Sequence, residues 1–197
     1  MQKQNTRVKI LNTAFELIYK NGFNATSIDD IIKHTAFTKG AFYHHFKTKE
    51  DLGIALISEI IKPGMEKALI LPLSTTKDPI ASIYYSIKDL LLNDELFDIK
   101  YGCPAINLIE EMSPTNKKFY LQLSQIIISW ENAIEQSIEK AKQNKIIPSS
   151  IISKEVSCLV ISGYAGIRNL GKIKGYECYN TYLGVLDKYL KSLTINQ

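Results

Sequence analysis

The sequence predicts an all-α fold, and three observations support this. Apolar residues recur every three or four positions over most of the 197 residues, as on the buried face of an amphipathic helix. No segment shows the sustained two-residue alternation of a half-buried strand. Hydrophobic residues make up 45% of the chain, which is enough for a sizeable core. We expect about nine helices, divided between residues 1–50 and residues 51–197.

The first two helices are predicted by a stripe and a capping pattern. A periodic apolar stripe over residues 8–18 predicts the first helix, which Asn21-Gly22 ends. Ser27 and Asp30 have the spacing of a capping box, in which each side chain accepts from the other residue's backbone amide. They predict a short second helix that ends near Thr35.

The later helices have start signals of the same kind. Thr38 is expected to cap a third helix that runs to His45, with Phe42 and Phe46 facing inward. A fourth begins with a second capping spacing at residues 48–51, and Lys62-Pro63-Gly64 is expected to interrupt it. The remaining helices are expected from Asp78-Pro79 through Leu91, over residues 105–112, from after Ser113-Pro114 to about Asn144, and over residues 153–171 and 177–193.

The charge of the chain is concentrated at one end. The net charge is +4, and residues 1–50 hold eight Lys or Arg against four Asp or Glu, so this segment carries all of the excess. All three histidines lie there too. This concentration favours an anionic partner, although a solvated basic face would have the same composition.

Composition also limits the class of protein. No apolar run approaches the ~18 residues of a membrane span, and the polar first residues lack a secretory signal, so we expect a cytoplasmic protein without membrane contact. Cys103, Cys158 and Cys178 have no spacing typical of a zinc site or a disulfide framework, and we expect reduced thiols. No motif indicates a metal site or a cofactor, so we expect neither.

Two short helices joined by a tight turn and braced by a third are the helix-turn-helix arrangement, which places a helix in the major groove of DNA. The helix that begins at Thr38 would enter the groove, because its face opposite Phe42 and Phe46 remains free. Hydroxyl, ammonium, phenol and imidazole groups there can bind phosphates or base edges. The candidate DNA contacts are Thr26, Ser27, Thr38, Lys39, Gly40, Ala41, Tyr43, His44, Lys47 and Lys49.

Two stretches, ATSIDDI at residues 25–31 and TKGAFYHHFKTKEDL at residues 38–52, carry a resemblance to a known family. They are similar to the DNA-binding domain of the tetracycline-repressor (TetR) family of bacterial regulators. The sequence departs at Phe42, where a smaller aliphatic residue is common in the family. The resemblance implies a helix-turn-helix DNA-binding domain over residues 1–50 and a helical ligand-binding and dimerisation domain over residues 51–197.

The resemblance also implies the partners: a double-stranded DNA operator, a small-molecule effector that releases it, and a second copy of the chain. A dimer would hold two recognition helices roughly 34–36 Å apart on a near-palindromic site. Gly163, Ala165 and Gly166 would allow helices to pack closely. The last helix carries more apolar and tyrosine surface than one monomer covers.

The effector end has weaker signals. A Gly-Cys-Pro…Asn-Leu…Glu pattern over residues 102–111 is similar to one branch of the family, where it opens the short helix beneath the effector cavity. Arg168, if inward, would favour a carboxylate or phosphate, and if outward would be surface or dimer charge. Aromatic residues there line a cavity or belong to the core. The candidate ligand contacts are Tyr101, Cys103, Asn107, Trp130, Tyr164 and Arg168.

Several functions fit these patterns. The favoured one is a ligand-responsive repressor. One alternative is a repressor that senses electrophiles or oxidants through Cys103, whose thiol is otherwise a small buried hydrophobe. Another is a constitutive DNA-binding protein without an effector. An enzyme is disfavoured, because the adjacent histidines His44 and His45 beside Glu50 and Asp51 lack the spacing of a metal or acid–base centre.

Overall fold

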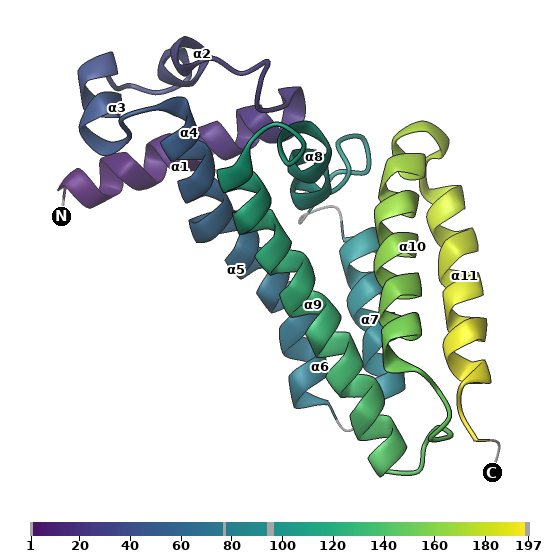
Figure 1. Ribbon diagram of the computed structural model, residues 1–197. Helices are drawn as coiled ribbons and strands as arrows, with labels where there is room; N and C mark the ends of the chain where they lie inside the picture. Colours follow the sequence, from purple (N-terminus) through teal and green to yellow (C-terminus); the bar gives the residue numbers. More distant parts are fainter. Residues whose placement is uncertain (1, 77, 94–96, 196–197) are drawn as a thin grey trace. The chain divides into compact units, whose positions relative to one another are not determined.

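The computed structural model describes residues 2–76, 78–93 and 97–195, and side chains from residue 6 onward (Figure 1). Every regular element in these residues is a helix, which confirms the all-α prediction. None of these helices is long and apolar enough to cross a membrane. The elements are α1 (Gln2–Asn21), α2 (Ile28–Lys33), α3 (Lys39–His45), α4 (Lys49–Leu56), η1 (Ile57–Ile61), α5 (Lys62–Met65), η2 (Glu66–Ile70), α6 (Leu71–Thr75), α7 (Pro79–Leu92), α8 (Pro104–Met112), α9 (Lys117–Gln143), α10 (Ser153–Lys174) and α11 (Tyr176–Ser192).

The five segments from α4 to α6 form one uninterrupted helical path between Lys49 and Thr75. Counted in this way, the described residues contain nine helices, as the sequence predicts.

The expected interruption of the fourth helix at Lys62-Pro63-Gly64 is wrong, because the helical path continues through these residues to Thr75. A proline lacks the N–H group and its ring collides with the carbonyl one turn earlier. The helix widens to a π turn immediately before each of its two prolines. The amide of Lys62 donates to the carbonyl of Ile57, and the amide of Leu71 donates to the carbonyl of Glu66. The wider turn changes the path of the backbone before each proline, and the helix continues.

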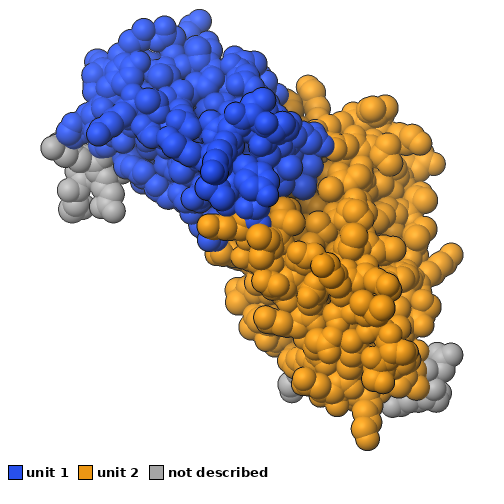
Figure 2. Space-filling model, viewed as in Figure 1, with its two compact units in different colours: residues 1–63, 104–124 blue, residues 64–103, 125–197 orange. Residues whose placement is uncertain are grey.

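The chain forms two compact units, coloured separately in Figure 2. Unit 1 contains residues 1–63 and 104–124, and unit 2 contains residues 64–103 and 125–197. Residues 1–50 therefore share unit 1 with the whole of α4, with η1, with α8 and with the start of α9.

Unit 1 is built around α1, which packs against α2, α3 and α4. The buried stripe of α1 runs through Ile10, Leu11, Ala14 and Ile18, whereas Val8 is 48% exposed although it fits the sequence periodicity. The stripe is therefore rotated toward Ile10, and α1 still presents one continuous apolar face to the other three helices.

Three of the predicted helix starts in unit 1 have the expected caps. Ser27 and Asp30 form a capping box at α2, and Thr48 and Asp51 form another at α4. The hydroxyl oxygen of Thr38 accepts from the amide of Ala41 at 3.2 Å, which caps α3. A cap of this kind stabilises a helix by about 1 kcal/mol, which matters for helices as short as α2 and α3.

Unit 2 packs α7 against α6 and α11, and α10 against α11. Two glycines on α10 allow this helix to approach α11 closely. A Cβ atom on Gly163 would lie 2.7 Å from the hydroxyl of Tyr182, and one on Gly171 would lie 2.4 Å from the ring of Tyr179. By contrast, a Cβ atom on Gly166 would meet nothing within 4 Å. Gly163 and Gly171 therefore serve packing within the chain, and Gly166 does not.

Candidate nucleic-acid interface

The face of α3 that is turned away from the rest of unit 1 carries most of the expected DNA contacts. Phe42 and Phe46 are buried, with ring centroids 5.7 Å apart, and they fix the inward face. The outward face is exposed, and Tyr43 has 51% of its surface accessible. The exposed candidate contacts on and beside α3 are Thr38, Lys39, Gly40, Tyr43, His44 and Lys47, and Ala41 is half-buried.

Ser27 caps the start of α2, Lys39 is the first residue of α3, and both carry exposed polar groups. Ser27 is exposed, and its hydrogen bonds to Asp30 lower the pKa of that carboxyl group. The ammonium of Lys39 lies 2.6 Å from the carboxylate of Asp29, and both side chains are mostly exposed. An exposed ion pair of this kind contributes little to stability, so Lys39 can exchange Asp29 for a phosphate at small cost.

Thr26 and Lys49, which are also expected contacts, make interactions inside unit 1. The hydroxyl of Thr26 is buried and donates to the carbonyl of Gly22 at 2.7 Å, which closes the turn after α1. The ammonium of Lys49 donates to the carbonyl of Asn24 at 3.3 Å and lies 4.6 Å from the ring centroid of Phe23. Partial burial lowers the pKa of Lys49. The structure thus gives both residues a packing role that the sequence did not indicate.

Glu111, on α8, holds the turn between α1 and α2. Its carboxylate accepts from the amide of Phe23 at 2.8 Å and from the amide of Asn24 at 2.6 Å. Gly22 precedes them with a φ of 92°, which glycine adopts easily. Glu111 lies in the Gly-Cys-Pro…Glu pattern, but no sequence signal indicates its partner 88 positions earlier.

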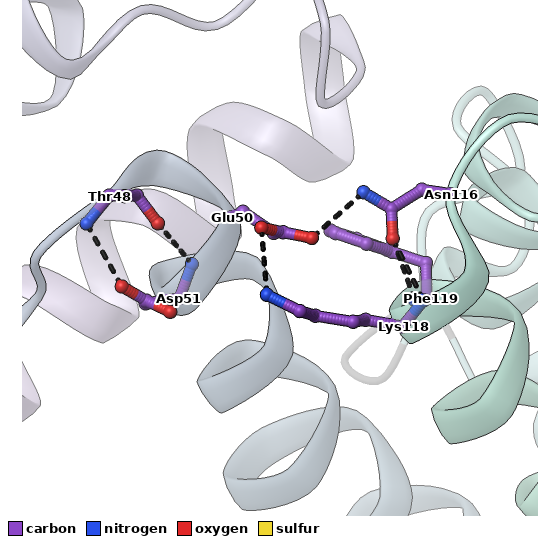
Figure 3. Close-up of polar contacts among 6 residues, drawn as sticks. All are labelled: Thr48, Glu50, Asp51, Asn116, Lys118 and Phe119. Atoms are coloured by element: carbon purple, nitrogen blue, oxygen red, sulfur yellow. Dashed lines mark hydrogen bonds and ion pairs between the residues drawn. The ribbon is translucent and has the colours of Figure 1, made fainter.

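A second carboxylate, that of Glu50, joins α4 to the start of α9 (Figure 3). The carboxylate of Glu50 accepts from the side-chain amide of Asn116 at 3.0 Å and from the ammonium of Lys118 at 3.1 Å. These bonds lower the pKa of Glu50. The other end of the Asn116 side chain accepts from the amides of Lys118 and Phe119, so it also caps α9.

An aromatic contact accompanies the hydrogen bonds of Glu111 and Glu50. The rings of Phe23 and Phe119 meet edge to face, with centroids 4.8 Å apart. A Cβ atom on Gly53 would lie 2.5 Å from Phe119 and 2.6 Å from Phe23, so only glycine allows α4 to approach both rings. Residues 104–124 therefore brace the helix-turn-helix through packed rings, through the carboxylate of Glu111, and through the bonds of Asn116 and Lys118 to Glu50.

Arg7 ties α1 to η1 and to the end of α3. Its guanidinium forms a two-pronged ion pair with the carboxylate of Glu59 and lies 5.0 Å from the ring centroid of Phe46. The hydrogen bonds to Arg7 lower the pKa of Glu59. A planar guanidinium can make the paired bonds and the ring contact together, which an ammonium cannot.

The expected ligand residues divide between the units. Trp130, Tyr164, Arg168 and Cys103 are all buried in unit 2, where the rings of Trp130 and Tyr164 meet edge to face at 5.3 Å. Burial and the neighbouring Cys103 thiol raise the pKa of Tyr164. Cys103 has no exposed surface, which favours packing over chemical sensing.

The other two candidates are Tyr101, two residues before Cys103, and Asn107, which belongs to the other unit. Tyr101 is half-buried in unit 2, with the ammonium of Lys100 5.4 Å from its ring centroid. Asn107 is half-buried on α8 in unit 1. Tyr179 accepts a hydrogen bond from Arg168 at 3.3 Å. It is not among the ligand candidates expected from the sequence, because it is one of several tyrosines on an apolar helix face.

Comparison with known proteins agrees with this arrangement. Residues 10–56 match the family model for bacterial regulatory proteins of the tetR family. An HTH-type transcriptional regulator in the lacX 3′ region of Lactococcus lactis subsp. lactis is 31% identical over 163 residues, which cover 80% of this chain and 83% of that protein. The HTH-type transcriptional regulator UidR of Escherichia coli (strain K12) is 39% identical over 84 residues, which cover 43% of this chain and 39% of UidR.

The fold has a solved counterpart in the crystal structure of a TetR-family transcriptional regulator from Cytophaga hutchinsonii. The two share 18% sequence identity and superpose with a TM-score of 0.89 over 100% of this chain and 98% of that chain. The chain therefore belongs to the tetR family of bacterial regulatory proteins, and it is a helix-turn-helix transcriptional regulator.

Proposed function

We propose that this regulator is a cytoplasmic repressor, without catalytic activity, that binds a near-palindromic operator as a homodimer and is released by a small-molecule effector. The observation that carries the DNA-binding half is the outward face of α3. Buried Phe42 and Phe46 hold the helix, and the opposite face offers the exposed groups of Lys39, Tyr43 and His44.

The exposed residues differ in their proposed roles. The phenol of Tyr43 and the imidazole of His44 lie on α3 and read base edges or fix its register. Lys39, Lys47 and the hydroxyl of Ser27 bind phosphates. Thr38, Gly40 and Ala41 begin α3, where small side chains let the backbone approach the duplex.

A gel-shift titration on the DNA upstream of the gene, at several salt concentrations, tests this proposal. Lys47→Ala is expected to weaken binding to every sequence and to reduce the slope of log K against log salt by about one, as loss of one phosphate contact does. His44→Ala and Tyr43→Ala are expected to change the preference among sites as well. Absence of a salt-sensitive complex on any operator-length DNA would refute DNA binding through α3.

Lys49→Ala is the matched control for Lys47, because it removes the same charge two residues away. Its ammonium is held by the carbonyl of Asn24 and the ring of Phe23, so we expect the salt slope to stay unchanged. An equal fall in slope would mean that Lys49 turns outward to a phosphate when DNA binds.

The dimer is proposed to form through α10 and α11. The exposed side of these helices carries an apolar stripe, in which Ile173 is 86% exposed, and two glycines, Gly166 and Gly184, with open space around them. The stripe residues are Leu159, Leu170, Ile173 and Val185. A second copy would cover this surface in a four-helix arrangement, which removes apolar area from water.

Ile173→Glu is expected to convert the dimer to a monomer, because the interface would then bury an unpaired carboxylate. Light scattering after size-exclusion chromatography measures the mass directly. Val8→Glu, at an exposed apolar position of α1, is the control and should leave the mass unchanged. An Ile173→Glu protein that stays dimeric would place the dimer contact elsewhere.

A further inference from the structure

Arg168 is the only charged residue among the described side chains that is fully buried. It lies on α10, and its guanidinium donates to the hydroxyl of Tyr164 at 3.2 Å, to the hydroxyl of Tyr179 at 3.3 Å and to the carbonyl of Leu90 at 2.6 Å. It also lies 5.5 Å from the ring centroid of Phe97. Every one of these partners is a neutral group.

Among the residues that the structure describes, no opposite charge therefore balances Arg168. The ion pairs formed by the described side chains all involve other residues. A buried charge is costly in an apolar interior, and proteins normally pair it with an opposite charge. The three hydrogen bonds use one N–H on each nitrogen of the guanidinium, which has five N–H donors in all. One N–H on each terminal nitrogen remains for another acceptor.

We propose that the effector is a monocarboxylic acid with an apolar body, and that its carboxylate binds to Arg168. This inference rests on the proposed function, since it names the chemical class of the effector. The two remaining N–H groups match the two oxygens of a carboxylate. One negative charge neutralises the guanidinium, whereas a phosphate dianion would leave an excess charge in the same apolar surroundings.

The surroundings of Arg168 define the rest of the ligand. Phe97, Tyr164 and Tyr179 present rings to the guanidinium at 5.5–5.7 Å from their centroids, and Trp130 backs Tyr164. Such walls favour an aromatic or aliphatic body.

The composition of the chain supports a specific use of arginine here. Of the 24 basic residues only Arg7 and Arg168 are arginines, and the others are lysines. Arg7 makes a two-pronged ion pair with Glu59. Arg168 has the same planar fork without a carboxylate partner among the described residues, and unlike a buried lysine it keeps its charge at every physiological pH.

The two arginines also make the test direct. Protein labelled with ¹⁵N only at arginine gives two Nε–H signals in an NMR spectrum, and Arg7→Lys identifies which belongs to Arg168. We would titrate acetate, benzoate and hexanoate, each against its neutral amide, on the full-length protein. We expect at least one carboxylate to shift the Arg168 signal without shifting the Arg7 signal. We expect the corresponding amide to bind at least about tenfold more weakly. Acetate is too small to be excluded by shape, so a static Arg168 signal with all three would overturn the proposal.

Arg168→Met and Arg168→Lys provide the matched variants, with Lys154→Met as a control that removes an exposed charge from the same helix. Calorimetry should show that Arg168→Met loses the preference for carboxylate over amide and that Arg168→Lys reduces it, while Lys154→Met keeps it. A preference that survives in Arg168→Met would overturn the proposal. If Arg168→Met fails to fold, the Arg168→Lys comparison and the NMR titration of the unaltered protein still decide.

The same preparations separate this inference from the proposed function. A protein that binds its operator but shows no carboxylate response at Arg168 retains the DNA-binding role and loses this effector class. A protein that binds the carboxylate at Arg168 but forms no complex with DNA loses the repressor proposal and keeps the ligand site.

Discussion

Replacement of Phe42 by alanine is expected to lower the free energy of unfolding by about 3–5 kcal/mol and to abolish operator binding. The ring is fully buried and packs against Phe46, so truncation leaves a cavity between α3 and the rest of unit 1. Since this ring sets the orientation of α3, the outward face loses its fixed position. Urea unfolding followed by circular dichroism measures the stability, and a gel shift measures binding.

Tyr43→Ala is the matched control, because Tyr43 is the next residue and is half exposed. It should change stability by no more than about 0.5 kcal/mol while still weakening or altering DNA binding. Phe42→Leu should fold and bind, because leucine refills most of the space and smaller aliphatic residues are common there in the resembled family. Normal stability of the Phe42→Ala protein would mean that this ring does not anchor the recognition helix.

Trp130→Ala is expected to have an effect of similar size on unit 2, a loss of about 3–5 kcal/mol in the free energy of unfolding. The indole is fully buried on α9 and meets the ring of Tyr164 edge to face. Its removal leaves Tyr164, one of the partners of Arg168, without support on that side. Thermal unfolding by calorimetry measures the loss.

The control for Trp130 is Ile128→Ala on the same helix, where the side chain is 52% exposed. This change should shift stability by no more than about 0.5 kcal/mol. In the ¹⁵N-arginine spectrum, Trp130→Ala should also move the Arg168 signal, whereas Ile128→Ala should not. Equal losses from the two variants would show that Trp130 is not the centre of this core.

The sequence predicted the helices well because their signals are local. The caps at Ser27, Thr38 and Thr48 each involve residues three positions apart, and the structure contains all three. The error at Pro63 has a local cause too. A propensity rule treats proline as a stop, but an α-helix can widen by one residue per turn and continue, and nothing in the pattern distinguishes the two outcomes.

The candidate site was predictable only where it depends on the helix periodicity. The outward face of α3 follows from the inward positions of Phe42 and Phe46. By contrast, the contacts of Lys49 with Asn24 and of Glu111 with Phe23 join segments that are distant in the chain. A charged residue near a helix start has the same sequence pattern whether it binds DNA or braces a neighbouring turn, so only the tertiary structure separates these roles.

Arg168 shows the same limit. Its position on an amphipathic helix left both an inward and an outward placement open, because arginine is common at the edge of an apolar stripe. The choice depends on Leu90 and Tyr179, which belong to other helices and supply the acceptors that make burial tolerable. Hydrogen-bond partners of this kind have no periodic signature.

Unit 1 is discontinuous in sequence, since residues 104–124 complete it after an excursion of 40 residues through unit 2. This imposes an order on biosynthesis. At ~5–20 residues per second, the ribosome needs roughly 3–12 s to extend the chain from residue 63 to residue 124. During that interval the ring of Phe23 lacks Phe119, and the turn after α1 lacks Glu111. The amino-terminal helices, although made first, therefore reach their final structure only after the first helices of the other unit have been synthesised.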